Sequence, residues 1–149
     1  MSYIIEVNPA TARRQLILRP AFPTVVCICG STRFVEAWKQ AHRAESLAGR
    51  IVLSVGVAIH MGDSPIREDS PDKRLLDELH FRKIELCDEV LILNVGQYIG
   101  PSTGRELAYA ICLGKPIRTL EQMDVVNWYK KREPESPLIA PGVGCYAAR

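Results

Sequence analysis

The apolar run Val90-Leu91-Ile92-Leu93 leads, after a short connection, into Ile99-Gly100-Pro101-Ser102-Thr103-Gly104-Arg105-Glu106. A run of this length is typical of a buried strand, and the small residues after it are typical of a loop that begins a helix. In open parallel sheets, ligands bind outside the carboxyl ends of the strands. The order strand, loop, helix therefore predicts that the carboxylate of Glu106 lies at a binding edge.

A second stretch of the same kind lies earlier in the chain. The residues Val25-Val26-Cys27-Ile28-Cys29 also read as a short buried strand, and Gly30-Ser31-Thr32-Arg33 follow before a helical pattern begins. Because parallel strands end at the same edge of a sheet, we expect the two loops to lie side by side. One loop then supplies hydroxyl groups and a cation, and the other supplies a carboxylate.

Strands and helices alternate along the rest of the chain, which predicts a parallel α/β sheet with right-handed crossovers. The expected strands are Thr24 to Cys29, Ile51 to Val55, Glu89 to Asn94 and Pro116 to Thr119. The expected helices are Phe34 to Ala48, Pro71 to about Leu86, Ser102 or Thr103 to Leu113, and Met123 to Lys131.

The length of 149 residues predicts a single domain, 1–149, with its core at 24–120. Residues 1–23 form an amino-terminal extension in which Tyr3 to Val7 and Gln15 to Leu18 suggest a hairpin. Residues 133–149 are rich in proline and glycine and predict an irregular tail. The long segment Gly56 to Ser70 is a candidate lid over the sheet edge.

Composition excludes several classes of function. The formal charge of +2 and the interspersed positive and negative residues argue against a nucleic-acid polymer as partner. No apolar segment approaches the roughly 18 residues of a membrane span, and no signal peptide is evident, so we expect no membrane association and a cytoplasmic location. The five cysteines form no paired CxxC set, which predicts neither a disulfide nor a structural zinc.

Glu106 has two interpretations. With Thr103 it matches a capping box, in which a glutamate reaches back to the backbone amide of the cap residue. Its expected position at the binding edge favours a catalytic role instead. A lone carboxylate there can attack an electron-poor carbon, such as the anomeric carbon of a sugar.

The loop Gly30, Ser31, Thr32, Arg33 is neither a Walker A sequence nor a GxGxxG fingerprint. Amides at a helix start, two hydroxyl groups and a guanidinium can nevertheless hold a phosphate. In the alternative, Ser31 or Thr32 only caps the helix. Arg33 favours the anion site, because a cation at a helix amino terminus opposes the helix dipole unless an anion compensates it.

Three further polar residues are weaker candidates. His80 lies three residues after Asp77 on one expected helix, so the carboxylate could orient the imidazole as a general acid. The alternative is a solvated helix face, because charged residues surround the pair. His60 lies in the candidate lid, where it could contact a base or sugar.

These residues make the chain similar to a known family. Over about residues 24–120 it resembles the nucleoside 2-deoxyribosyltransferase superfamily, and within it the 2′-deoxynucleoside 5′-monophosphate N-glycosidases more than the transferases. The resemblance is carried by Cys29-Gly30-Ser31-Thr32-Arg33, by Asp88 at the opening of the third core strand, and by Gly104-Arg105-Glu106-Leu107-Ala108-Tyr109-Ala110 followed by Gly114-Lys115-Pro116.

The resemblance implies a flavodoxin-like (Rossmann-like), doubly wound parallel sheet in three layers. It implies that Glu106 attacks the anomeric carbon, and that Ser31 and Arg33 bind a 5′-phosphate with Ser102 as a second phosphate ligand. The rest of the Gly30 to Arg33 loop, Gly104 and Asp88 are expected to contact the substrate. His80 stands where family members commonly carry an aspartate that positions the sugar or handles the proton.

The sequence therefore predicts an N-glycosidase that releases the free base from a nucleoside 5′-monophosphate, with Glu106, His80 and Asp77 as catalytic residues. The alternatives are a transferase that moves deoxyribose between bases, and a non-catalytic module that binds or senses a nucleotide. No metal and no organic cofactor is implied, because the mechanism needs only a carboxylate and an acid. A homodimer or larger homo-oligomer is the expected assembly.

Overall fold

A four-stranded parallel sheet organises the chain in the computed structural model, which describes residues 2–7, 14–19, 22–55 and 69–132. The strands lie in the order β4-β3-β5-β6. Their bounds are Val25–Gly30 for β3, Ile51–Leu53 for β4, Glu89–Leu93 for β5 and Ile117–Thr119 for β6. Numbered within this sheet along the chain, the order is 2-1-3-4, which confirms the predicted flavodoxin-like arrangement.

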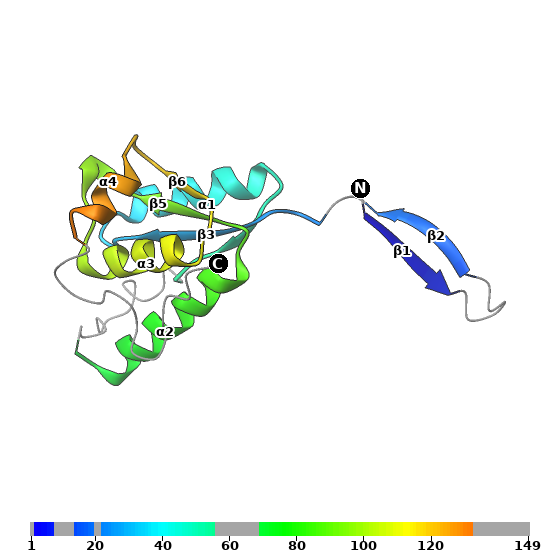
Figure 1. Ribbon diagram of the computed structural model, residues 1–149, viewed down its shortest axis with the longest axis horizontal. Helices are drawn as coiled ribbons and strands as arrows, with labels where there is room; N and C mark the ends of the chain where they lie inside the picture. Colours follow the sequence, from blue (N-terminus) through cyan, green and yellow to red (C-terminus); the bar gives the residue numbers. More distant parts are fainter. Residues whose placement is uncertain (1, 8–13, 20–21, 56–68, 133–149) are drawn as a thin grey trace.

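Helices cover both faces of this sheet, as Figure 1 shows. The helices are α1 (Val35–Leu47), α2 (Pro71–Leu86), α3 (Pro101–Cys112) and the short α4 (Val125–Lys130). Helix α1 packs through Trp38 against one face of β3 and β5. Helices α2 and α3 pack through Ile84 and Leu107 against the other face. The result is the predicted three-layer architecture.

The strand sequences explain why both faces are covered. Successive side chains of a strand point to opposite faces. In β3, Val26 and Ile28 therefore belong to the α1 side, whereas Cys27 and Cys29 belong to the side of α2 and α3. All four are fully buried. A strand that is apolar at every position, as β3 is here, needs an apolar layer on both sides.

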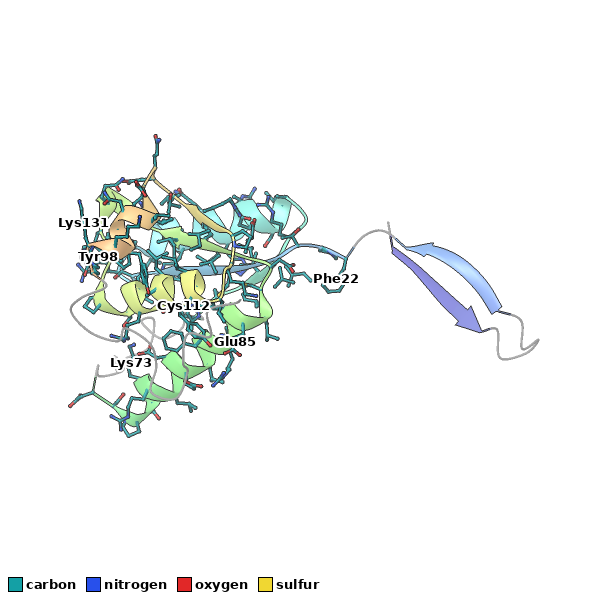
Figure 2. All side chains as sticks on the ribbon, viewed as in Figure 1. Phe22, Lys73, Glu85, Tyr98, Cys112 and Lys131 are labelled. Carbon is teal, nitrogen blue, oxygen red and sulfur yellow. The ribbon has the colours of Figure 1, made fainter. Side chains whose placement is uncertain are left out.

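The connections reverse direction between β3 and β5. The chain leaves β3 through α1 and pairs β4 on one side of it, then crosses through α2 to pair β5 on the other side. The loops after β3 and β5 consequently diverge to opposite faces and leave a crevice at their carboxyl ends. In Figure 2, Lys73 and Tyr98 lie at this end of the molecule, and Phe22, before β3, lies at the other.

Gly30 allows the two strands to end so close together. It is paired in register with Leu93, the last residue of β5. A Cβ atom at Gly30 would lie 2.7 Å from Leu93 Cβ and 3.3 Å from the Leu93 carbonyl oxygen. Any larger residue would push the strand ends apart at the crevice.

Several predicted boundaries need correction. Helix α3 begins at Pro101 with Gly100 as its N-cap, and the cap makes no side-chain hydrogen bond, so the prediction of Ser102 or Thr103 as cap is wrong. Proline at the first helical position needs no amide partner, which explains the earlier start. Strand β4 ends at Leu53 instead of Val55.

The amino-terminal hairpin is confirmed, as β1 (Ser2–Val7) pairs antiparallel with β2 (Arg14–Arg19) in a separate two-stranded sheet. Most of the candidate lid, residues 56–68, and the predicted tail, residues 133–149, lie outside the described residues. None of the described helices is long and apolar enough to cross a membrane.

The cysteines only partly follow the prediction. Cys27, Cys29 and Cys87 are free and buried, as expected of reduced core thiols. Cys112 is disulfide-bonded, so the expectation that the chain holds no disulfide is wrong at this residue.

We expect Gly30→Ala to lower the free energy of unfolding by about 1–3 kcal/mol, because the added methyl group overpacks the junction of β3 and β5. Urea denaturation measures the change. Gly104→Ala is the matched control: its Cβ would lie 3.5 Å from Trp128, an ordinary contact, so it should cost little or stabilise α3. A Gly30→Ala protein as stable as the wild type would contradict the close approach.

Candidate functional site

A pocket opens at the carboxyl ends of β3 and β5, where the connections reverse. Both predicted loops line it, together with the first turns of α2 and the start of α3. The lining residues are Gly30, Ser31, Thr32, Arg33, Val55, Lys73, Leu76, Asp77, Tyr98, Gly100, Pro101, Ser102, Thr103 and Glu106. The structure therefore brings together the Gly30 to Arg33 loop, Asp77, Ser102 and Glu106, as the sequence predicted.

Glu106 is the most deeply buried carboxyl group in the pocket lining, with 7% of its surface exposed. It lies in the second turn of α3, six positions into the helix, so it cannot complete a capping box with a helix that begins at Pro101. Its Oε2 atom has no hydrogen-bond partner among the described residues. The capping interpretation is therefore wrong, and the carboxyl group is left for another purpose.

The environment of Glu106 favours its neutral form. Burial, and then the nearby Asp77 carboxylate, raise the pKa of Glu106 to about 8. The Lys73 ammonium acts in the opposite direction. A perturbed carboxyl group in a cleft at a sheet's carboxyl edge is the pattern expected of a reactive residue.

His80 lies behind Glu106 and does not line the pocket. Its Nε2 atom is 3.8 Å from Glu106 Oε1 and 3.3 Å from Cys29 Sγ. Burial, reinforced by the positive charge of Lys83, lowers the pKa of His80 to about 4, so the imidazole is neutral near pH 7. His80 therefore contacts the reactive carboxyl group and cannot reach a ligand directly.

The predicted Asp77–His80 pair is not formed. Asp77 instead accepts a hydrogen bond from Lys73 Nζ through Oδ1 and faces Arg105 Nη2 at 3.4 Å through Oδ2. Ser102 Oγ joins this group, 3.1 Å from Arg105 Nη2 and 3.5 Å from Lys73 Nζ. The two cations hold Asp77 and Ser102 at the pocket wall.

The loop after β3 presents its polar groups to the pocket. The N-cap of helix α1 is Phe34, and no side chain caps the helix by a hydrogen bond. The alternative interpretation, in which Ser31 or Thr32 is present only as the cap of this helix, is therefore wrong. The Ser31 carbonyl accepts hydrogen bonds from the Phe34 amide and from Trp38 Nε1, both at 3.1 Å, which fixes the turn.

Arg33 is exposed, and its guanidinium lies 4.5 Å from the centre of the Tyr98 ring. Among the described residues it has no carboxylate partner. The stacking joins the loops after β3 and β5 and leaves the N–H donors of Arg33 available for an anion.

Two predicted substrate-binding residues, Asp88 and Gly104, do not line the pocket, and the prediction for a third, His60, is not tested. Asp88 lies at the opposite edge of the sheet, where its Oδ2 accepts a 2.7 Å hydrogen bond from the Val25 amide and joins the starts of β3 and β5. Gly104 faces Trp128 of α4, so its small size serves helix packing. His60 lies outside the described residues.

Sequence reasoning missed the lining residue Lys73 and one cluster. Lys73 stands four residues before Asp77, a spacing that predicts an ion pair on a helix. Tyr98, for which the sequence left stacking on a base and ordinary packing both open, lines the pocket and stacks with Arg33. Cys27 and Cys29 are two positions apart on one strand and therefore share a face. Together with His80 they form a cluster whose ligand atoms could hold a metal ion.

Comparisons with known proteins add one observation on the fold. No protein-family model matches the sequence, and no curated protein matches it. A solved structure of a 2-deoxyribosyltransferase from Bacillus psychrosaccharolyticus is similar, with a TM-score of 0.50 at 14% sequence identity, over 68% of this chain and 78% of that one. The two proteins share a fold.

The buried neutral imidazole predicts acid sensitivity. The pKa of His80 is about 4 in the folded protein and 6.5 in the unfolded chain. Between these values the unfolded chain binds a proton that the folded protein does not, so the free energy of unfolding falls as the pH is lowered from 6.5 toward 4. Between pH 7 and 4, we expect His80→Leu to lose about 3 kcal/mol less unfolding free energy than the wild type. Urea denaturation at each pH measures this difference.

The matched control is His42→Leu, at an exposed position of α1. It should follow the wild-type dependence on pH. Equal losses in the wild type and in His80→Leu would show that His80 is not held neutral in the fold.

Proposed function

We propose that this chain is an N-glycosidase that hydrolyses the bond between base and sugar in a nucleoside 5′-monophosphate. The observation that carries the proposal is the buried carboxyl group of Glu106 in a pocket whose other side bears Arg33, exposed and stacked on Tyr98. A reactive carboxylate and an anion-binding arginine at one sheet edge suit a substrate that has an anomeric carbon and a phosphate.

The reaction would take place in two steps at Glu106. In the first, the carboxylate attacks C1′, the C1′–N bond breaks with its electron pair going to the base, and the leaving nitrogen takes a proton from water. In the second, water attacks C1′, the bond between C1′ and Glu106 breaks with its electron pair returning to the carboxylate, and the proton lost by the attacking water neutralises the hydroxide left by the first step. The two steps together consume one water molecule and yield a free base and a sugar phosphate.

Other residues would bind and orient the substrate. Arg33 and the hydroxyl of Ser31 would hold the phosphate, and Ser102 would add a ligand on the facing wall. Asp77, fixed by Lys73 and Arg105, would accept hydrogen bonds from sugar hydroxyl groups. His80 would act through Glu106, as a positioning residue, because it lies within 3.8 Å of that carboxyl group and not at the pocket surface.

A second candidate function is transfer of deoxyribose from one base to another. It is favoured by the structural likeness to a 2-deoxyribosyltransferase. The first step would be the same, and a second base would replace water in the second step. A binding module that senses nucleotides would use the same pocket without either step.

The test is to incubate the purified protein with ribo- and deoxyribonucleoside 5′-monophosphates and with the matching nucleosides, with and without an added base, and to follow the products by chromatography. We expect base release from monophosphates. Glu106→Gln should reduce the rate by at least about 10³-fold, because it removes the nucleophile while keeping the shape.

Arg33→Ala should raise KM for monophosphates about 10- to 100-fold, the loss of one charge-assisted contact, and should leave nucleosides unaffected. Arg132→Ala is the matched control, since Arg132 stacks on Trp128 outside the pocket lining. Release that needs an added base would favour the transferase. If the protein binds monophosphates but releases no base from any compound, the result would contradict the N-glycosidase and support the non-catalytic binding module.

A further inference from the structure

A cluster of metal-ligating side chains lies on the inner side of Glu106. Cys27 and Cys29 come from the same face of β3, and His80 comes from α2. His80 Nε2 lies 3.9 Å from Cys27 Sγ and 3.3 Å from Cys29 Sγ. The three ligand atoms all lie within 4.8 Å of one another, and all three residues are buried.

These distances fit a tetrahedral ion. With Zn–S near 2.3 Å and Zn–N near 2.0 Å, a sulfur and a nitrogen ligand of one zinc ion are about 3.5 Å apart. The two observed separations, 3.3 and 3.9 Å, lie on either side of that value. Two thiolates and an imidazole form a ligand set that suits thiophilic ions such as Zn²⁺.

Glu106 lies beside the cluster but outside the three residues whose ligand atoms are all within 4.8 Å of one another, so its side chain must turn toward an ion to complete the set. Its Oε1 atom lies 3.8 Å from His80 Nε2, and its Oε2 atom has no hydrogen-bond partner among the described residues. Carboxylates are common fourth ligands of zinc. Glu106 lines the pocket while the other three residues do not, so an ion that enters from the pocket meets this carboxyl group first.

His80 also argues against simple core packing. Its Nδ1 atom has no hydrogen-bond partner among the described residues, although the side chain is only 1% exposed. An unpaired polar atom in a core costs free energy. An apolar residue would avoid that cost, whereas a metal ligand must retain the imidazole.

We propose that Cys27, Cys29, His80 and Glu106 form a site for one thiophilic divalent cation, represented by Zn²⁺. Binding releases to solvent the two thiol protons and, below about pH 8, the proton of Glu106, and it forms two metal–sulfur bonds, one metal–nitrogen bond and one metal–oxygen bond. The bound ion takes up Glu106 and so inhibits the reaction at C1′. The inhibition rests on the proposed function, whereas the binding does not.

Binding is tested without any substrate. Equilibrium dialysis of the full chain against Zn²⁺ should give one ion per chain, and Co²⁺ in place of Zn²⁺ should give thiolate-to-cobalt charge-transfer absorption. Cys27→Ala should weaken Zn²⁺ binding by more than about 100-fold. His42→Ala, which removes an exposed imidazole of α1 away from the cluster, should bind as the wild type does.

Wild-type protein without bound Zn²⁺ or without the cobalt absorption would overturn the site, whether or not any variant folds. Equal binding by Cys27→Ala would overturn it as well. If base is released, Zn²⁺ should inhibit the wild type and His42→Ala but not Cys27→Ala. If no base is released, dialysis still decides the site, so failure of the proposed function and failure of the metal site remain distinguishable.

Discussion

The removal of the Glu106 carboxyl group from water is the constraint on which the site depends. Ionising a carboxyl group in a buried place costs free energy unless charges or hydrogen bonds compensate it. Here the compensation is incomplete: Lys73 and Arg105 favour the charged form, while burial and Asp77 oppose it more strongly. The result of these opposing effects is a pKa of about 8, so Glu106 is mostly protonated at pH 7 and becomes mostly ionised above about pH 8.

The fold creates this burial through two local features. Gly30 lets β3 and β5 end within contact of each other, so the loops that diverge from them enclose a narrow crevice. Pro101 starts α3 early, which places Glu106 in the second helical turn, beyond reach of the cap. Together these features direct the side chain inward, toward Cys29 and His80, instead of along the helix surface.

The sheet and its helices could be predicted because each depends on local pattern. The apolar runs at Val25 to Cys29 and Val90 to Leu93 identified buried strands, and Gly49 and Gly114, both at positive φ in the structure, marked helix ends. The position of Glu106 at the binding edge followed from strand order alone. The predicted homodimer and the cytoplasmic location stay predictions.

What could not be predicted depends on three-dimensional neighbours. Asp77 and His80 are one helical turn apart, yet Arg105 and Ser102, from another helix, decide that Asp77 faces the pocket and His80 the core. Asp88 opens its strand, as the sequence indicated, so it lies at the edge away from the crevice, and its expected contact with the substrate rested on the family resemblance alone. The partners of Cys27 and Cys29 likewise become visible only when α2 packs on β3.

The most direct test of the account is the dependence of kcat/KM on pH for base release from a monophosphate between pH 7 and 10. Over this range the substrate phosphate is already a dianion, since its second pKa is near 6. If the Glu106 carboxylate is the nucleophile, kcat/KM should rise with pH and level off above about 8, the pKa of Glu106 in the free protein. A kcat/KM that falls over the same range would mean that the protonated form of Glu106 does the work, and would contradict the nucleophilic mechanism.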